Sequence, residues 1–473
     1  MKAFHGTLIH SPELGEIEIL ENTLLLVADN GRIEAVEPRI ERGEVNAFLQ
    51  SRGLLLQGSA IAAATENGDK NVTIHYLART QFLIPGFVDT HNHAPQWAMR
   101  GLGQGLHILD WLDRITFPQE ARFADAAHAR RVYARCVDGF LQQGVTTASY
   151  YGSRHPQATD VLADLCFEKG QRALVGKCNM DRNAPDTYRD ADAEESLRDT
   201  EACIAHVQSV DPGGKLLQYV LTPRFAITCT PTLLRGLGDI AARSKQSTST
   251  THNHPEGMAI QTHFNEAEQE MASTRELFPE FRDEVELYSH FGLLTPRTIL
   301  AHCCYATDSE MDRLGELGCG VAHCPISNMT VGGGFMAAPI RAFLDRGIPV
   351  GLGTDSGGGF SSSMLDAMRQ ALVASNAREV QSSGKLKGLS IPEVFHLATQ
   401  GGANVCGLGD KVGTIEVGKE FDALLVDANP ARPGVMTMVE DDDSLATVFE
   451  KFVMTGDDRN IEQVFVGGRL VKS

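Results

Sequence analysis

Two histidines that stand two residues apart, at the end of a short apolar run, are the first residues of this sequence whose types and spacing could do chemistry. The run covers residues 82–89 and leads into Thr90-His91-Asn92-His93. Side chains two residues apart on an extended chain point to the same side, so His91 and His93 could bind one metal ion together. The same four residues recur at 251–254, but there they follow a polar tract rich in serine and threonine. We interpret that second copy as a loop and keep only the first pair as candidate ligands.

Three later apolar runs also end in side chains that can bind metals or transfer protons. One ends in His263, with Glu266 three residues further on; another ends in His302, and the last ends in Asp355. Three neutral imidazoles and a carboxylate suit a borderline divalent ion such as zinc, and iron has overlapping preferences. Such an ion would lower the pKa of a bound water to about 7 and supply hydroxide at neutral pH. Glu266 could serve beside it as a proton carrier.

These candidates need elements that bring the ends of distant runs to one place. Between residues 82 and 353, eight short apolar runs alternate with segments whose apolar residues recur at helical spacing, as at Val132, Cys136 and Phe140. Alternating strands and helices predict a parallel sheet, and eight such units predict a closed (β/α)8 TIM-like barrel. The predicted strands are residues 82–89, 145–151, 172–180, 216–222, 258–262, 298–302, 320–323 and 349–353. Because catalytic residues of such barrels lie at the C-terminal ends of strands, we expect the candidates to share one rim.

Both ends of the chain are predicted to consist of short strands without intervening helices. The N-terminal runs are residues 3–9, 16–20, 23–28 and 32–36, with a hairpin turn at Asn30-Gly31 and a loose insertion at 51–71. The C-terminal runs are residues 413–417, 422–426, 463–466 and 469–471. Neither end has enough strands for a stable sheet alone, so we expect both to form one small β-sandwich domain. The predicted division is therefore 1–81 and 410–473 for the small domain and 82–409 for the metal-dependent barrel.

The charge balance of the chain argues against some partners. Its 473 residues include 42 Lys and Arg against 61 Asp and Glu, which gives a net charge of −19. Such a chain is a poor partner for a nucleic-acid polymer or an anionic membrane surface, although the charge would not hinder a small neutral substrate. Its ten cysteines lack a CxxC spacing, and the N-terminus lacks the apolar segment of a signal peptide. We therefore expect a cytoplasmic protein with reduced thiols.

Residues 85–93, Pro-Gly-Phe-Val-Asp-Thr-His-Asn-His, resemble the first-strand signature of the amidohydrolase superfamily. The resemblance continues in order through His263, His302 and Asp355. The spacing of His263 and Glu266, three residues apart, resembles the pattern of the mononuclear deaminase branch. The fourth predicted strand also offers no lysine at its tip that could bridge two metals. Within that branch the chain resembles the guanine deaminases at residues 93–96, 116–123, 222–225, 351–365 and 456–462.

The resemblance implies a function and a role for each candidate. It implies hydrolytic deamination of guanine at C2, giving xanthine and ammonia, by a zinc enzyme of purine metabolism that forms a homodimer. The implied zinc ligands are His91, His93, His263 and Asp355, with iron as the alternative metal. Asp355 would also accept the proton of the attacking water, Glu266 would protonate the ring nitrogen beside C2 and pass the proton to the leaving amine, and His302 would orient the water or the tetrahedral centre.

Two polar residues are candidates for recognition of the base. Arg224, at the tip of the fourth predicted strand, could direct its guanidinium at the exocyclic oxygen of guanine. Gln96 carries a donor and an acceptor in one amide. The alternatives are an ion pair at the barrel rim for Arg224 and an exposed loop amide for Gln96. The resemblance implies that the substrate pocket also includes His93, Ala94, Pro95, Phe225, His263 and Glu266.

Two other functions stay open on the sequence. A related deaminase or dechlorinase acting on a triazine, an adenosine-like thioether or a pterin would keep the metal ligands and differ at Arg224 and Gln96. A non-enzymatic relative built on the same barrel would have lost metal ligands, whereas here each of them is present.

Overall fold

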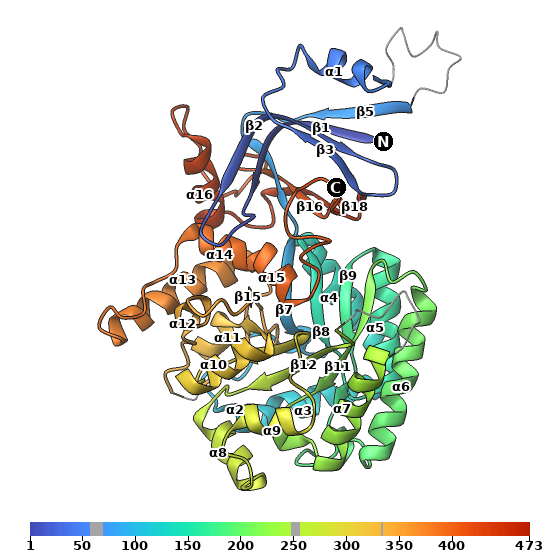
Figure 1. Cartoon of the computed structure of the whole chain (residues 1–473), viewed down its shortest axis with the longest axis vertical. Coiled ribbons are helices and arrows are strands. Elements are labelled where there is room, and N and C mark those ends of the chain that lie inside the picture. Colours follow the sequence, from blue (N-terminus) through green and yellow to red (C-terminus); the bar gives the residue numbers. More distant parts are fainter. Residues whose placement is uncertain (57–69, 247–255, 333) are drawn as a thin grey trace.

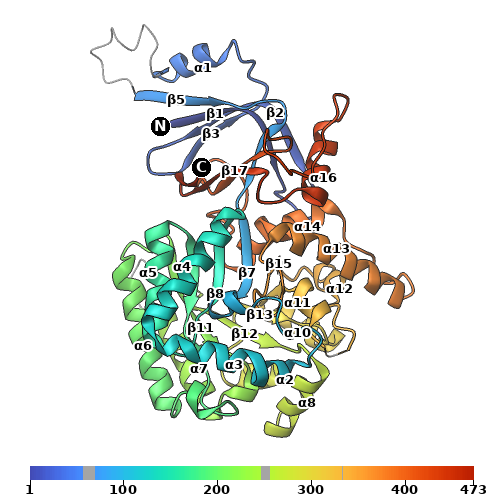
Figure 2. The same cartoon turned by 180° about the vertical axis from the view of Figure 1, so that it is seen from behind.

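The chain forms a barrel and a small β domain that lie end to end. The computed structural model describes residues 1–56, 70–246, 256–332 and 334–473. The two bodies are distinct in two opposite views, with the small domain above the barrel (Figures 1 and 2). The second His-x-His copy and most of the predicted insertion lie outside the described residues. No described helix is long and apolar enough to span a membrane.

The barrel consists of eight neighbouring strands whose pairs are all parallel. They are β7 (Phe87–His93), β8 (Val145–Tyr151), β9 (Arg172–Gly176), β11 (Leu217–Pro223), β12 (Ala259–Phe264), β13 (Thr298–His302), β14 (Gly320–His323) and β15 (Val350–Leu352), in this spatial order, with β10 (Cys178–Asn179) pairing β11. The first and last strands meet as well, since the hydroxyl of Thr90 donates to the carbonyl of Leu352 at 2.9 Å. The predicted parallel barrel is confirmed.

Helices follow the strands and cover the outside of the barrel. They include α4 (Ala126–Gln142), α5 (Pro156–Lys169), α6 (Ala193–Val210), α7 (Pro231–Gln246), α10 (Asp308–Leu317), α12 (Ile340–Leu344), α13 (Met364–Gln381), α14 (Ile391–Ala398) and α15 (Gln400–Val405). Local sequence sets their ends: the side chain of Asp125 caps α4, and Gly170 ends α5 with φ 80°. The face of α4 that carries Val132, Cys136 and Phe140 is buried, as its spacing predicts.

The small domain combines both ends of the chain in one connected sheet. Its strands are β1 (Lys2–His10), β2 (Glu18–Val27), β3 (Ile33–Glu37), β4 (Leu54–Leu56), β5 (Lys70–Tyr76), β6 (Gln81–Pro85), β16 (Ala423–Asp427), β17 (Ile461–Val466) and β18 (Arg469–Lys472), with helices α1 (Val45–Ser51) and α16 (Leu445–Thr455) beside them. The rings of Phe4, Phe421 and Phe465 pack together with centroids 5.2–5.5 Å apart, so segments from both ends share one core. The expected meeting of the two ends is confirmed.

Several predicted strands differ in the structure. Residues 82–89 are divided at Gly86, because β6 pairs β1 and β16 of the small domain and only β7 belongs to the barrel. Residues 16–20 and 23–28 are one continuous strand, β2. Residues 413–417 form no strand: glycines with positive φ stand on both sides, at 413 and 418, while Ile415 still packs into the core of the small domain. The division of the chain at residues 82 and 410 itself stays a prediction.

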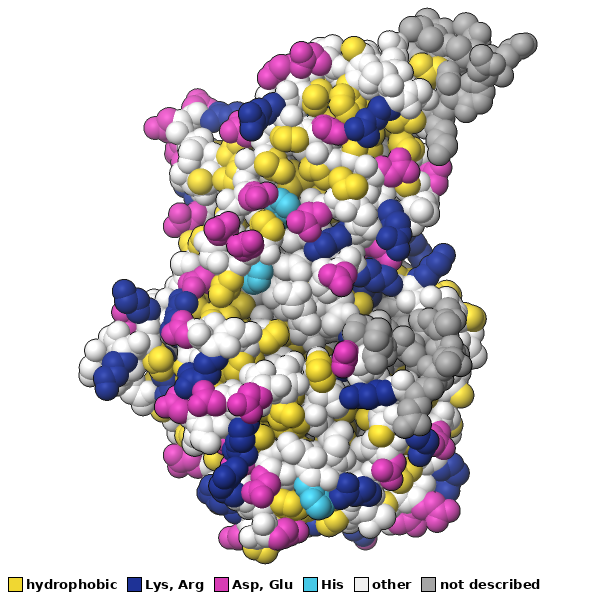
Figure 3. Space-filling view, viewed as in Figure 1, with side chains coloured by type: hydrophobic (Ala, Val, Ile, Leu, Met, Phe, Trp, Pro, Cys, Tyr) yellow, Lys and Arg dark blue, Asp and Glu magenta, His cyan; other side chains and the backbone are white. Residues whose placement is uncertain are grey.

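The C-terminal ends of the barrel strands lie at the end of the molecule away from the small domain. This end is covered by α2 (Ile108–Trp111), α3 (Phe117–Glu120), α8 (Glu268–Leu277) and α9 (Glu284–His290), which lie in the lower part of the barrel in Figure 1. On the face that Figure 3 shows, acidic and basic side chains are interspersed. Because these helices cover the C-terminal ends of the strands, the rim that carries the candidate residues lies beneath them and away from the small domain.

Candidate active site

Four predicted metal ligands converge at this rim. His91 and His93 come from β7 and His263 from β12, and their ligand nitrogens lie within 4.8 Å of one another. The Nε2 atoms of His93 and His263 are 3.2 Å apart. Oδ1 of Asp355 lies 3.3 Å from Nε2 of His91 and 3.6 Å from Nε2 of His93. The structure thus brings together residues from three distant parts of the chain.

Backbone contacts between β7 and the segment after β15 hold Asp355 in place. Its N–H donates to the carbonyl of His91 at 2.8 Å. Two residues before His91 on β7, the buried carboxylate of Asp89 accepts hydrogen bonds from the N–H of Thr354 at 3.0 Å and from its hydroxyl at 2.7 Å. Asp355 itself has φ 43°, in the left-handed region that non-glycine residues rarely adopt. Such backbone strain persists where surrounding contacts enforce it, and it is common at functional sites.

The imidazoles of this cluster are set to present nitrogen lone pairs. Burial lowers the pKa of His91, and it holds the pKa values of His93 and His263 well below their usual range, so all three are neutral near pH 7. Nδ1 of His263 lies 2.6 Å from the carbonyl of Arg224 and must donate to it, which leaves Nε2 without a proton. Nε2 faces the centre of the cluster.

These donors fit a divalent metal ion. Nε2 of His263 faces Nε2 of His93 at 3.2 Å, and Nε2 of His91 is buried with no hydrogen-bond partner among the described residues. Ligand atoms that surround zinc tetrahedrally at 2.0–2.1 Å stand about 3.3 Å apart, close to the spacings observed. For Asp355 burial acts to raise the pKa, but the close contact with His91 at 3.3 Å and the other nearby imidazoles hold that pKa well below its usual range. The carboxylate is therefore ionised, and the set matches three imidazoles with one carboxylate.

Glu266 and His302 lie together beside the ligand cluster. Oε1 of Glu266 is 3.7 Å from Nε2 of His302, and both side chains are buried. Burial is the main cause that raises the pKa of Glu266 to about 7, so its carboxyl group can gain or lose a proton near neutral pH. The ring of His302 is oriented by Asn328 of α11 (Pro325–Thr330), whose Oδ1 is 2.8 Å from Nδ1. This pair has the arrangement of an acid–base group next to an oriented imidazole.

The segment that carries Glu266 is anchored by three other buried glutamates. Asn265 has φ 45°, and its N–H donates to Glu284 at 2.9 Å while its side-chain amide donates to Glu310 at 2.9 Å. The N–H of Glu266 faces Glu270 at 3.3 Å. These contacts determine the direction in which Glu266 leaves the end of β12.

A pocket opens above the cluster. Its lining residues are His93, Gln96, Ile108, Trp111, Leu112, Arg224, Phe225, His263, Glu266, Ser327, Val331, Asp355 and Gly358. The structure therefore places Gln96, Arg224 and Phe225 on the same pocket as Glu266 and the metal ligands, as the sequence predicts. Ala94 and Pro95 are buried in the short 3-10 helix Ala94–Met99 and are not among the described residues that line the pocket.

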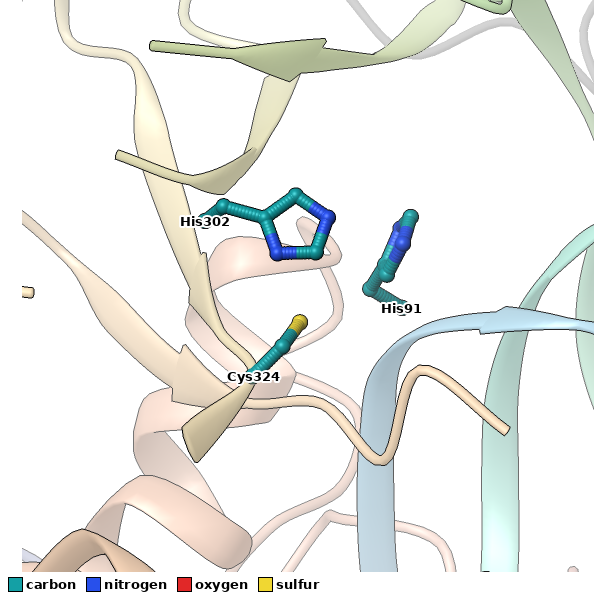
Figure 4. A group of neighbouring side chains, drawn as sticks. All are labelled: His91, His302 and Cys324. Atoms are coloured by element: carbon teal, nitrogen blue, oxygen red, sulfur yellow. The ribbon is translucent and has the colours of Figure 1, made fainter. Parts of the chain in front are cut away.

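Sequence reasoning missed several residues of the site. One side of the pocket is an apolar wall formed by Ile108, Trp111, Leu112 and Val331. The spacing of these residues in the sequence does not indicate that they line a pocket. Cys324 lies at the end of β14 next to His91 and His302, and all three side chains point toward one space (Figure 4). Burial raises the pKa of Cys324 well above its usual range, so it stays a thiol. The fully buried Glu120 contacts both Arg224 and Gln96. Its place in the segment 116–123 was its only signal.

Comparisons with known proteins agree with this geometry. The model of the amidohydrolase family matches residues 82–471. A probable guanine deaminase of Schizosaccharomyces pombe is 40% identical over 468 residues, which cover 99% of this chain and 83% of that protein. The guanine deaminase of Homo sapiens is 36% identical over 472 residues, covering 99% of this chain and 96% of that one. A crystal structure of guanine deaminase from C. acetobutylicum with bound guanine superposes with a TM-score of 0.83 at 28% identity, over 99% of both chains. The chain therefore belongs to the amidohydrolase family.

Proposed function

We propose that this chain catalyses the hydrolytic deamination of guanine, with water replacing the amine at C2 to give xanthine and ammonia. The observation that carries the proposal is the pocket itself, where Arg224 and Gln96 face the same space as Glu266 and the histidine cluster. Relatives of which this chain covers most of the length are named guanine deaminases. A neutral purine base also suits a chain of net charge −19, because the base has no phosphate to be repelled.

We propose zinc as the bound metal, with iron as the alternative, and His91, His93, His263 and Asp355 as its ligands. The convergent nitrogen lone pairs and the ionised carboxylate support this set. When bound, the ion would act as a Lewis acid that makes a water molecule reactive near neutral pH.

The chain's own residues account for the proton transfers. Asp355, with its low pKa, is ionised and can accept a proton from the attacking water. Glu266 can protonate the ring nitrogen beside C2 as negative charge builds up on the ring, and then pass a proton to the departing amine. His302 lies 3.7 Å from Glu266 and orients the water or the tetrahedral centre. Each of these interactions becomes stronger as the reaction proceeds, which is the condition for catalysis.

The pocket supplies recognition of the base. Arg224 would donate to the exocyclic oxygen and Gln96 would contact the ring edge, while Phe225 closes the apolar side. His93, His263 and Glu266 line the reacting end. Ala94 and Pro95, which precede Gln96 in the same short helix, would shape the pocket indirectly.

Assembly and location complete the proposal. We propose a homodimer, which the resemblance of the sequence to the guanine deaminases implies. A reducing cytoplasm suits ten cysteines that are all buried with free thiols. Light scattering of the purified protein would test the dimer.

The test of the activity is direct. Purified protein is incubated with guanine, and xanthine formation is followed by ultraviolet absorbance while ammonia is assayed separately. His263→Ala and Glu266→Gln should each abolish turnover, the first through the metal site and the second through the proton carrier. A panel of aminotriazines, adenosine thioethers and pterins serves as the comparison. Strong activity on one of those substrates with poor activity on guanine would contradict the proposal.

A further inference from the structure

Glu120, at the end of α3, holds the two side chains proposed to recognise the base. Its Oε1 accepts hydrogen bonds from Nε2 of Gln96 at 2.7 Å and from Nη2 of Arg224 at 3.4 Å. Its Oε2 accepts hydrogen bonds from Nη1 of Arg224 at 2.9 Å and from the hydroxyl of Tyr188. The side chain is fully buried, and Glu120 is not among the described residues that line the pocket. It therefore acts on the pocket through Gln96 and Arg224.

The contact with Glu120 fixes which end of the Gln96 amide faces the pocket. Because Nε2 donates to the carboxylate, the amide cannot turn without placing its oxygen against Glu120. Oε1 of Gln96 is buried and has no hydrogen-bond partner among the described residues. A buried acceptor without a partner is unfavourable, so a ligand that brings an N–H donor to this oxygen is favoured.

The same carboxylate keeps Arg224 a fixed donor. The guanidinium is permanently charged, and Glu120 accepts from its Nη1 at 2.9 Å and its Nη2 at 3.4 Å, which holds the side chain in one orientation. A guanidinium has five N–H donors in a rigid fork, and Glu120 takes only part of them. The remaining N–H groups are available to an acceptor in the pocket, where Arg224 lies next to Phe225 and His263.

We propose that Glu120 is a positioning residue that sets the hydrogen-bond polarity of the pocket, with Arg224 as donor beside Gln96 as acceptor. This inference rests on the proposed function. It assigns the pocket to purines whose six-membered ring carries a carbonyl next to a ring N–H, as guanine does. A purine with an amino group next to an unprotonated ring nitrogen presents the opposite pattern, so its donor would meet Arg224 and its lone pair would meet Gln96.

The test uses Glu120→Gln and 2,6-diaminopurine. This probe keeps the amine at C2 but carries an amine at C6 and an unprotonated N1, so it differs from guanine mainly in polarity. In Glu120→Gln the new amide can donate to Oε1 of Gln96, which lets the Gln96 amide turn. We expect the KM for guanine to rise at least about tenfold with kcat changed less than about threefold. The inhibition constant of 2,6-diaminopurine should stay within about threefold of the wild-type value or fall.

Two further variants keep the test decisive. Tyr188→Phe removes another donor to the same carboxylate without touching the pocket. The ratio of the KM for guanine to the inhibition constant of 2,6-diaminopurine should then change less than about threefold. Glu120→Asp keeps the charge on a shorter side chain that cannot reach both partners. It should move the ratio in the same direction as Glu120→Gln, and it replaces that variant if Glu120→Gln does not fold.

Equal weakening of guanine and 2,6-diaminopurine, or an unchanged KM for guanine, would overturn the role of Glu120. Absence of guanine deamination in the wild-type protein would instead contradict the proposed function, so the two failures are distinguishable.

Discussion

Nδ1 of His263 donates its hydrogen to the backbone carbonyl of Arg224 across 2.6 Å, so a metal-ligand candidate and a substrate-binding candidate share one contact between the ends of β12 and β11. The contact uses the main chain of Arg224, while its guanidinium pairs with Glu120. Metal binding and base recognition therefore depend on different parts of the same residue, and they can be separated by changing the side chain alone.

Arg224→Lys should weaken guanine binding and leave metal content unchanged. Lysine cannot make the two bonds of the guanidinium fork to Glu120, but the carbonyl that orients His263 is retained. We expect the KM for guanine to rise at least about tenfold. Metal per chain, measured by elemental analysis, should equal that of the wild-type protein. Loss of metal in Arg224→Lys would show that the side chain supports the ligand cluster, contrary to this separation.

Gly357 is the position where an added methyl group should harm the pocket most directly. It has φ 129°, and a Cβ there would lie 2.0 Å from Oε1 of Gln96. Gly357→Ala should therefore displace the amide and raise the KM for guanine at least about tenfold.

Gly384→Ala is the matched control for Gly357→Ala. Gly384 also has a positive φ, 79°, but a Cβ there meets nothing within 4 Å. The strain of a left-handed alanine should lower stability by about 1 kcal/mol and leave the kinetic constants at wild-type values. Equal KM values in the two variants would rule out the direct contact with Gln96.

Glu284 should tolerate an amide better than an apolar side chain. Burial, together with the charge of Glu270, raises the pKa of Glu284 well above its usual range, which favours the protonated carboxyl group. Glu284→Gln mimics that neutral form and still accepts the N–H of Asn265. Glu284→Leu leaves this N–H without a partner and should lower the free energy of unfolding by about 1–3 kcal/mol.

The Glu284 variants also test how Glu266 is held. Because the lost acceptor anchors the segment before Glu266, Glu284→Leu should lower kcat more than Glu284→Gln does. Chemical denaturation and steady-state kinetics on both variants measure the two effects. A Glu284→Gln protein as unstable as Glu284→Leu would mean that the group is ionised in the folded protein.

His155 should make the folded state less stable in mild acid. Burial, followed by the charges of Arg154 and Lys177, lowers its pKa from 6.5 to about 4, although Asp190 acts in the opposite direction. In the unfolded chain the ring takes a proton near pH 6.5, so between pH 6.5 and 4 the unfolded state binds more protons than the folded state. Its contribution to stability is present above pH 6.5 and is lost as the pH falls toward 4.

The measurement for His155 is a pair of unfolding curves at pH 7 and at pH 4.5. The wild-type protein should lose more stability between them than His155→Gln, which has no group that titrates in this range. An identical loss in both proteins would place the pKa of His155 at its ordinary value.

The positions of the candidate ligands and of Glu266 could be predicted from sequence because these residues lie at or just after the ends of buried strands. His263, His302 and Asp355 stand directly after or at the end of apolar runs, and a parallel barrel gathers such ends at one rim. Arg224 was predicted for the same reason. It forms a buried ion pair with Glu120 and also lines the pocket, while its contact with the base stays a prediction.

Other parts of the structure could not be predicted because their partners are remote in sequence. Glu120 contacts residues that are 24 and 104 positions away, and no periodicity links them. The change of sheet at Gly86 falls inside one continuous apolar run, so composition gave no boundary there. The strand expected at residues 413–417 has the apolar content of a strand, but its flanking glycines turn the chain instead.

The most direct test of the account measures bound metal and guanine-dependent product formation on the same preparation. We expect about one zinc or iron per chain, and xanthine and ammonia formed in equal amounts, with turnover lost when the metal is removed by a chelator and regained when it is restored. A preparation that carries the metal and converts no guanine, or one that deaminates guanine equally well after metal removal, would contradict it.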